Sequence, residues 1–383
     1  MLNGGGGLNP DGLSLDLQFA ADKTLTARKG PRPDFTRAST NGTFMGSNGL
    51  IQTAAINTPR FDHTSAGVCR GLLIEESRTN ICRQSENFGS FWAAAGCAVS
   101  IDTDVAPDGN TTADNVDITN GSGHSISQNI SVSASTVYTF SFWVKRGTAT
   151  ALSYSIFNST AGSNIVAPTS YYNQTSSAWA RVSFTFTTPV GCASILIYPL
   201  RDGGSTGTVL LWGAQLEVGS FATSYIPTGA GSVARSADVC SITGANFTSF
   251  WNQSEGTMFA ASTRLQPTGL FYNSIIVASD GTNNNRIFIG NGGNPNDIEF
   301  VISKFNVTEY NGSINNGGLV RRGALAYSQS SSNRSYNGNI GTDDTSSAIP
   351  AVTQLIIGAG QVISSTRYYK KRLSNAKLQA LTV

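Results

Sequence analysis

The stretch "VYTFSFWVKR", Val137 to Arg146, decides the fold class of this chain. Its apolar side chains recur at every second residue, at Tyr138, Phe140, Phe142 and Val144. The residues between them are Thr139, Ser141, Trp143 and Lys145. Successive side chains of a strand point to opposite faces. A period of two therefore predicts a β-strand with one buried face.

Neighbouring stretches repeat this pattern. "RVSFTFTT" (181–188) alternates in the same way, and "CASILIYPL" (192–200) and "TVLLWGAQLEV" (208–218) are also typical of strands. The Gly- and Asp-containing stretches "APDGN" (106–110) and "DGGSTG" (202–207) predict turns. Short strands separated by turns, with no helical window, predict a β-sandwich over residues 81–228.

A second series of strands follows the stretch "GSFATSYIPTGAGSVARSAD" (219–238), whose Pro and Gly residues mark a boundary, and we place the linker at residues 229–238. The strand-like stretches are "TMFAAS", "SIIVAS", "RIFIG", "IEFVI", "GALAY", "QLIIGAG" and "STRYY". Gly- and Asn-rich turns such as "SDGTNNN" (279–285) separate them. We therefore predict a second sandwich over residues 239–383. Asp and Asn oxygens in "SDGTNNN" raise the alternative of a calcium site, but a plain turn explains a single Asp better.

The chain ends in "RLSNAKLQALTV", which predicts a short helix. Ser374 suits the N-cap position, and Leu373 and Leu378 are spaced as a hydrophobic staple. Leu381 follows Leu378 by three residues, on the same helix face. We expect the helix to pack on the second sandwich through Leu378 and Leu381.

Residues 1–80 have no sustained period. "LSLDLQF" (13–19) alternates like a strand, "RKGPRP" (28–33) interrupts any element, and "GLLIEESRTN" (71–80) predicts another short strand. Too few apolar residues recur for a separate core. The prediction is an extended N-terminal arm that docks on another subunit or partner. The fold class is therefore all-β: this arm, two jelly-roll-like β-sandwich domains and a short C-terminal helix.

Composition narrows the function classes. The 383 residues carry a net charge of only +2, and 13% are charged, about half the usual share. Without a basic cluster, nucleic-acid binding is not supported. No secretory signal or apolar stretch of about 20 residues is visible, so we expect a soluble protein made in the cytoplasm, with no membrane partner.

Three long motifs carry a family resemblance. The run "FTRAST…SNGLIQTAAINTPRFDH…CRGLLIEESRTN" resembles the N-terminal part of virion-associated proteins of tailed bacteriophages. "APDGNTTADNV" with "YTFSFWVKR" and "LWGAQLEVGSFATSYIPT" is similar to the carbohydrate-binding-module-like sandwich of that family. "RSADVCSITGANFTSFWNQSEGTMF" with "YYKKRLSNAKLQALT" is similar to its concanavalin A-like (laminin-G-like) end domain. The resemblance covers the chain from about residue 13.

This resemblance implies a non-enzymatic structural protein on the virion surface, synthesised in the host cytoplasm. It leaves open capsid decoration, a head fibre or a tail appendage. Its partners would be other capsid or tail proteins and further copies of the same chain, with a trimer expected by analogy. The alternative is a receptor-binding module whose main task is to recognise host surface glycans.

Catalytic chemistry is not apparent in the sequence. A glycoside hydrolase needs two carboxylates across a sugar, and no strand carries such a pair. Glu75 and Glu76 are adjacent and so point to opposite faces. The two histidines, His63 and His124, lie far apart and no Gly-x-Ser-x-Gly accompanies them. We therefore expect no enzyme, no cofactor and no metal site.

Glycan binding and intermolecular disulfides remain as candidate roles for single residues. Sugar sites use aromatic faces with a few polar groups, which makes Tyr171, Tyr172 and Trp143 the candidate glycan-binding residues. Trp143 lies on the polar face of its strand, and the tyrosine pair lies in a loop-like stretch. The five cysteines form no Cys-x-x-Cys motif. Cys69 and Cys82 lie at the expected arm, so they are the candidates for bonds between subunits.

Overall fold

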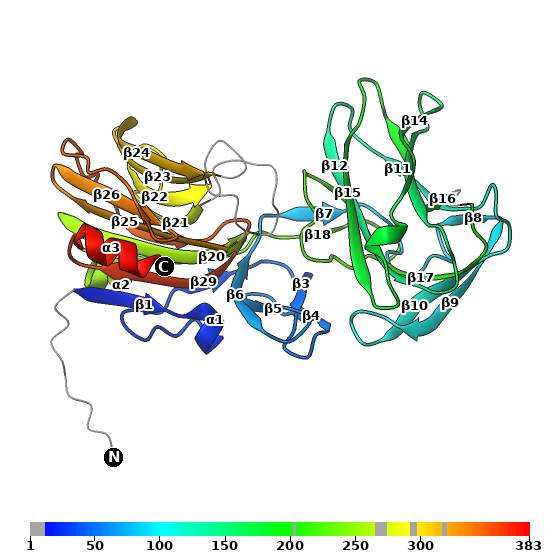
Figure 1. The fold of residues 1–383 in the computed structure, drawn as a ribbon, viewed down its shortest axis with the longest axis horizontal. Coiled ribbons are helices and arrows are strands. Elements are labelled where there is room, and N and C mark those ends of the chain that lie inside the picture. Colours follow the sequence, from blue (N-terminus) through cyan, green and yellow to red (C-terminus); the bar gives the residue numbers. More distant parts are fainter. Residues whose placement is uncertain (1–11, 202–203, 265–273, 292–296, 316–319) are drawn as a thin grey trace, which may run out of the picture.

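The computed structural model describes residues 12–201, 204–264, 274–291, 297–315 and 320–383. The described chain is nearly all β, as predicted, and forms two lobes joined by a narrow neck (Figure 1). Each lobe is a sandwich of antiparallel sheets.

The first lobe consists of two five-stranded sheets. One has the order β15 (Ala180–Thr187), β12 (Val137–Arg146), β17 (Gly207–Val218), β10 (Thr111–Ile118) and β9 (Cys97–Val105). The other has the order β14 (Ser163–Ser170), β13 (Ser153–Asn158), β16 (Ser194–Arg201), β11 (Ser125–Ser131) and β8 (Ala93–Ala95), and a 3-10 turn, η1 (Tyr172–Gln174), follows β14. Tyr138, Phe140, Phe142 and Val144 of β12 all lie in the core between the sheets, as their period of two predicts.

The second lobe also has two sheets, and together they contain fifteen strands. The larger has the order β27 (Asn339–Ile340), β26 (Ser331–Tyr336), β25 (Val320–Ser328), β20 (Glu255–Arg264), β29 (Gln361–Tyr369), β6 (Cys69–Ile74) and β5 (Arg60–His63), with β1 (Leu13–Leu17) also paired to β29. The smaller has the order β2 (Asp34–Thr36), β19 (Val239–Thr243), β28 (Gln354–Ile357), β21 (Ser274–Ser279), β22 (Arg286–Asn291), β23 (Asp297–Lys304) and β24 (Val307–Asn315).

The N-terminal segment is not an extended arm, which corrects the sequence-based expectation. Strands β1 and β6 both pair with β29, and β2 pairs with β19, so residues 13–74 complete both sheets of the second lobe. Leu15, Leu17 and Phe19 are fully buried in that lobe's core. The segment seemed to lack a core because it supplies only part of one, and strands far away in the sequence supply the rest.

The first lobe is therefore an insertion into the second. The chain leaves the second lobe through β7 (Arg78–Asn80) and returns through β18 (Val233–Arg235), and these two strands pair antiparallel as the neck. The expected linker at 229–238 is thus a structured part of the neck. It carries Arg235 and Asp238, both buried.

Gly71 shows how closely the N-terminal strands fit. This residue of β6 has φ +134°, and a Cβ there would lie 2.1 Å from the carbonyl oxygen of Ile363 on β29. Only glycine allows the two backbones to approach so closely. The seam between the N-terminal and C-terminal parts of the second lobe therefore depends on this position.

The remaining elements are short. A hairpin of β3 (Gly42–Met45) and β4 (Ile51–Ala54) stands between the lobes, and helices α1 (Phe19–Asp22) and α2 (Gly244–Phe250) pack on the second lobe. The C-terminal helix α3 (Asn375–Leu381) is confirmed: the side chain of Ser374 accepts from the backbone N–H of Lys377 at 3.4 Å. Leu378 is buried and Leu381 packs beside it, on side chains of β20 and β25.

Candidate functional site

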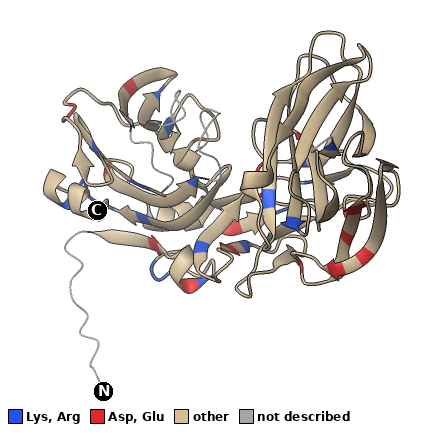
Figure 2. Ribbon diagram, turned by 45° about the vertical axis from the view of Figure 1, so that its right-hand side comes forward, with Lys and Arg blue, Asp and Glu red and all other residues tan. Residues whose placement is uncertain are grey.

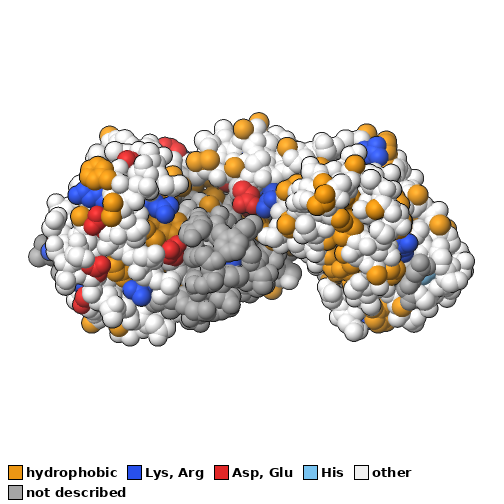
Figure 3. All heavy atoms as spheres, turned by 90° about the horizontal axis from the view of Figure 1, so that it is seen from above, with side chains coloured by type: hydrophobic (Ala, Val, Ile, Leu, Met, Phe, Trp, Pro, Cys, Tyr) orange, Lys and Arg blue, Asp and Glu red, His pale blue; other side chains and the backbone are white. Residues whose placement is uncertain are grey.

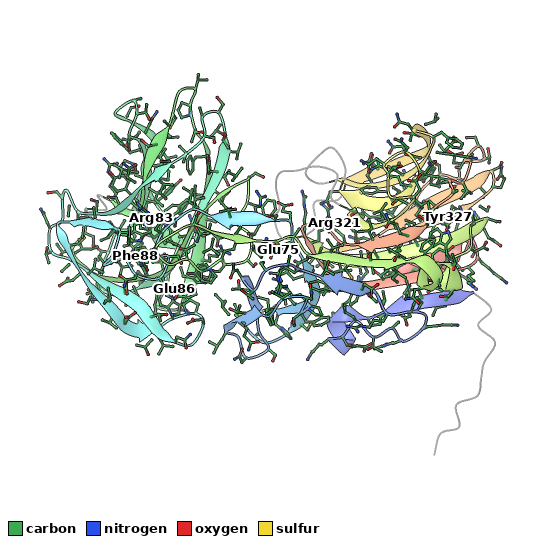
Figure 4. The ribbon with its side chains drawn as sticks, turned by 180° about the vertical axis from the view of Figure 1, so that it is seen from behind. Glu75, Arg83, Glu86, Phe88, Arg321 and Tyr327 are labelled. Carbon is green, nitrogen blue, oxygen red and sulfur yellow. The ribbon has the colours of Figure 1, made fainter. Side chains whose placement is uncertain are left out.

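A network of buried charges fixes the neck. Arg60 donates to Glu75 at 2.7 Å and to Asp238, and Arg37 donates to the other oxygen of Asp238 at 3.3 Å. Arg235 lies 3.1 Å from the Glu75 carboxylate. Burial alone would raise the pKa of Glu75, but the charges of Arg235 and Arg60 lower it from 4.5 to about 2. Glu75 lies between the lobes in Figure 4, and Figure 2 shows residues of both signs there. The network therefore joins the N-terminal strands to the returning neck.

A cavity of about 230 Å³ lies beside this network, between the lobes. We call it the junction pocket. The β3–β4 hairpin lines the pocket with Thr43, Phe44, Met45 and Ile51. Strands β5 and β6 supply Asp62, Arg70 and Leu73, and Glu75 follows directly after β6. The first lobe supplies Trp143, Arg181 and residues 222–225. The stretch from Phe35 to His63, irregular in sequence, is thus a wall of this pocket. The sequence does not reveal this role, because Trp143 and Arg181 on the opposite wall are distant from this stretch in the chain.

Aromatic rings form the first-lobe wall. Trp143, Trp212 and Tyr225 pack together, with ring centroids 5.3, 5.4 and 4.6 Å apart. Trp143 points out of the first lobe's core because its strand neighbours Phe142 and Val144 point in. Gly213 has φ +65°, and a Cβ there would lie 2.9 Å from the Trp143 ring. The strand alternation thus places an aromatic surface outside the sandwich core.

Arg181 lies on this aromatic wall. It is the register partner of Trp143 on β15, and its guanidinium carbon lies 4.4 Å from the Trp143 ring centre. It donates to the carbonyl of Thr223 at 2.6 Å and to the hydroxyl of Ser141 at 3.0 Å. Its Nε has no partner among the described residues. Desolvation lowers its pKa to about 10, against the opposing effect of Glu217 and Glu75.

The charges around the junction pocket do not balance. Asp62 and Arg70 form an ion pair, so their charges cancel each other. Four other buried or half-buried arginines then face three carboxyl groups: Arg37, Arg60, Arg181 and Arg235 against Glu75, Glu217 and Asp238. Within the described part of the chain, Arg181 is the arginine of this set with no carboxylate within 4.0 Å. Glu217 acts on Arg181 from a longer distance, and this set of seven residues carries one more positive than negative charge.

A second cavity, also of about 230 Å³, lies on the other side of the hairpin and shares Thr43, Ile51 and Tyr225 with the first. Its charged residues are Glu86 and Asp108. The Tyr225 hydroxyl donates to Glu86 at 2.9 Å. Burial raises the pKa of Glu86, and Asp108 adds to that shift. Glu86 lies within the first lobe in Figure 4, away from Glu75. The two cavities differ in charge, because the charged lining residues of the second cavity are both acidic, whereas those of the junction pocket include two arginines.

The structure places the three candidate glycan-binding residues differently. Trp143 lines the junction pocket, although only 9% of it is exposed. Tyr171 is in the core of the first lobe, 1% exposed, and its hydroxyl donates to the carbonyl of Pro199 at 2.8 Å, so it is not the exposed aromatic that we expected. Tyr172 is half-buried, and the guanidinium carbon of Arg146 lies 4.4 Å from its ring centre. Arg181 and Tyr225 were missed, since a lone arginine on a strand's polar face gives no signal in the sequence.

The structure also places the two candidate disulfide cysteines differently. Cys82 is fully buried in the first lobe's core, so it cannot reach another chain while that lobe is folded, which corrects our expectation. Cys69 is half-buried on β6 and stays a prediction. All five cysteines are free thiols. Among the described residues, no group of three or more His, Cys, Asp or Glu is arranged to hold a metal ion.

Comparison with known proteins finds a similarity within the first lobe. Residues 84–198 match the family described as "Carbohydrate binding domain". No curated protein matches the chain. The first lobe is therefore similar to carbohydrate-binding domains over these residues, while the rest of the chain lies outside the family match.

Solved structures give partial likenesses. The sialidase CBM40 of Ruminococcus gnavus bound to α2,3-sialyllactose is 15% identical, with a TM-score of 0.28, covering 34% of this chain and 84% of that one. A structure titled "CBM4 structure and function" is 19% identical, with a TM-score of 0.26, covering 37% and 94%. The enzymatically active domain of bacteriophage CBA120 tailspike protein 4 is 16% identical, with a TM-score of 0.29, covering 36% and 21%. Separately, none of the helices in the described residues has the length and apolar character needed to cross a bilayer.

Proposed function

We propose that this protein is a non-enzymatic carbohydrate-binding component of a bacteriophage virion surface, and that its junction pocket binds a glycan. The observation that carries the proposal is the pocket itself: an aromatic wall and a guanidinium, built on a lobe that matches a carbohydrate-binding family. Sugar sites combine apolar faces with a few placed polar groups, and this pocket has both. The virion location rests on the N-terminal sequence resemblance. The alternatives of capsid decoration, head fibre and tail appendage remain, as does the expected trimer.

The pocket's charge favours an acidic sugar. Among the residues described, Arg181 has no carboxylate within 4.0 Å, and each of its terminal nitrogens keeps one N–H beyond those donated to Thr223 and Ser141, which a sugar carboxylate can accept. A uronic acid or similar unit would place its carboxylate at Arg181 and its ring against the apolar side chains of Trp143 and Met45. A neutral hexose would lack that charge-assisted contact.

The same chemistry argues against hydrolysis in this pocket. Arg60 and Arg235 hold Glu75 in its ionised form, and Asp62 is paired with Arg70. A glycosidase needs one carboxyl group that keeps its proton near neutral pH. Glu75 does not meet that need.

The test is binding of D-glucuronic acid and D-galacturonic acid, measured by saturation-transfer NMR, against glucose and galactose. We expect the uronic acids to bind and the matched hexoses to bind at least about tenfold more weakly, the scale of one charged contact. Ala222→Trp, which puts bulk at the half-buried lining residue Ala222, should abolish the signal. Ala167→Trp, on exposed β14, is the matched control and should not change it.

Two results would contradict the proposal. If all four sugars bind Ala222→Trp as well as they bind the unmodified protein, the junction pocket is not the site. If reducing ends are released from a host surface polysaccharide and Glu86→Gln abolishes the release, the protein is an enzyme that uses the second cavity. Equal binding of uronic acids and hexoses would overturn only the preference for acidic sugars.

A further inference from the structure

An exposed phenylalanine projects from the second lobe at an unusual backbone position. Phe305 is 76% exposed and lies in the two-residue turn between β23 and β24. Its φ is +51° and that of Asn306 is +63°. Hairpin turns of this kind favour Asn and Gly, because a bulky side chain in the left-handed region is strained. An aromatic ring kept exposed at a strained position suggests a function, since neither burial nor turn geometry explains it.

The turn is held in place by a neighbouring loop. The backbone N–H of Phe305 donates to the side-chain oxygen of Asn285 at 3.0 Å, and that of Asn306 donates to the carbonyl of Asn284 at 3.0 Å. Asn285 in turn donates to Asp280 at 2.8 Å. The loop "SDGTNNN", which the sequence predicts as a plain turn, therefore serves as a support that fixes the Phe305 turn.

A cavity of about 590 Å³ lies next to this ring; we call it the rim pocket. Seven of its ten lining residues are polar or charged, among them Gln253, Lys304, Gln329 and Thr353, while Phe305 and Ile349 are its largest apolar side chains. The amide of Gln253 is already used by the carbonyl of Pro350. Within the described residues, the side chains of Gln329 and Thr353 have no hydrogen-bond partner, and the ammonium of Lys304 lies 5.8 Å from the Phe305 ring centre.

We propose that the rim pocket is a second glycan-binding site, independent of the junction pocket. A sugar ring has an apolar C–H face and a rim of hydroxyl groups. Phe305 would stack on the face, while Gln329, Thr353 and Lys304 would bond the hydroxyls. The apolar side chains here are those of Phe305, Ile349 and the neighbouring Val307, but Lys304 lies among them, and interface centres are depleted of lysine, which disfavours a protein partner. Two sites on two lobes would let one chain hold two points of a polysaccharide.

The experiment uses the full chain carrying Ala222→Trp, so that the junction pocket is blocked, on a printed array of neutral and acidic bacterial surface oligosaccharides. We expect residual binding to this array. Phe305→Asn in the same background should weaken this residual glycan binding by at least about tenfold. It should also leave the melting temperature equal or higher, because Asn tolerates the left-handed turn. A residue with only a structural role would not give this combination.

Val190→Asn is the matched control, since Val190 is 90% exposed in the first lobe and lines neither cavity. Its binding should equal that of the parent. The proposal is overturned if the Ala222→Trp protein binds no glycan on the array, or if Phe305→Asn binds as well as its parent. It is also overturned if Phe305→Asn lowers incorporation into particles while glycan binding is kept, since that result identifies a protein contact.

Discussion

The two lobes have the same kind of architecture but opposite relations to the sequence. The first lobe is built from one continuous stretch, and its core residues all lie between Cys82 and Leu216. The second lobe needs both ends of the chain, because strands of residues 13–74 lie in the same sheets as strands beyond residue 239. The comparison teaches that a sandwich can be autonomous or dependent. On the face shown in Figure 3, acidic and basic side chains are scattered over the second lobe, whereas the first lobe shows mostly hydrophobic and uncharged side chains. The two lobes should therefore differ in how well they tolerate truncation and substitution.

Deletion of residues 1–80 tests this difference most strongly. It removes at least five fully or nearly fully buried apolar side chains of the second lobe: Leu15, Leu17, Phe19, Leu72 and Ile74. At about 1.5–3 kcal/mol each, the loss equals the whole stability of a typical domain. We expect the second lobe not to fold, whereas a fragment of residues 81–230 should melt cooperatively by circular dichroism. A truncated protein that keeps both melting transitions would show that the N-terminal strands are dispensable.

Gly71→Ala tests the seam within the second lobe at one residue. The added Cβ would meet the backbone of Ile363, which cannot move without separating β6 from β29. We expect the free energy of unfolding to fall by more than about 3 kcal/mol, among the large effects of single substitutions. Urea denaturation measures it.

The matched control for Gly71→Ala is Gly191→Ala in the first lobe. Gly191 also has a positive φ, +74°, but nothing lies within 4 Å of its Cβ position. It should cost only the backbone strain, about 1–2 kcal/mol. Equal effects of the two substitutions would mean that the close approach at Gly71 is not the cause.

Acid should loosen the neck before it unfolds the first lobe. The pKa of Glu75 is about 2 in the folded protein and 4.5 as its ordinary value, so its contribution is complete above pH 4.5 and is lost as the pH falls toward 2. The shift corresponds to about 3 kcal/mol. Hydrogen exchange of the neck amides between pH 5 and pH 2.5 would follow it.

Glu75→Gln is the matching variant, because it removes the titration and leaves Arg60 and Arg235 without one carboxylate. It should be less stable at pH 7, by about 3–5 kcal/mol for a broken buried ion pair, and its neck should show a weaker pH dependence over that range. An unchanged pH dependence in this variant would assign the acid sensitivity to groups other than Glu75.

The smallest effect is expected at the thiols. Burial raises the pKa of Cys82 and Cys240, the latter to about 12, so both should resist a thiol reagent at pH 8 in the folded protein. Cys69 and Cys97 are half-buried and should react. If Cys69 links subunits, non-reducing gels of particles should show a higher-mass band that Cys69→Ser removes. Fast labelling of Cys82 in the native protein would mean that the first lobe opens readily.

The sequence alone determined what is local. Alternation at residues 137–146 and 181–188 predicts strands with a buried face, and Ser374 with Leu378 predicts the C-terminal helix; the structure has all three. These features follow from side-chain period and capping, which act over a few residues. The outward direction of Trp143 follows from the same period.

Only the tertiary structure decided how the strands are shared. Strand pairing depends on backbone hydrogen bonds between segments more than 300 residues apart, such as Leu13 with Tyr369, and the sequence carries no local mark of such a partner. The N-terminal segment therefore resembled an arm, and the neck resembled a linker. The junction pocket has the same origin: Met45, Asp62 and Arg181 meet only because the first lobe is inserted beside the hairpin. Its charges come from both sides, because Arg181 belongs to the first lobe whereas Asp62, Arg70 and Glu75 belong to the N-terminal part of the second.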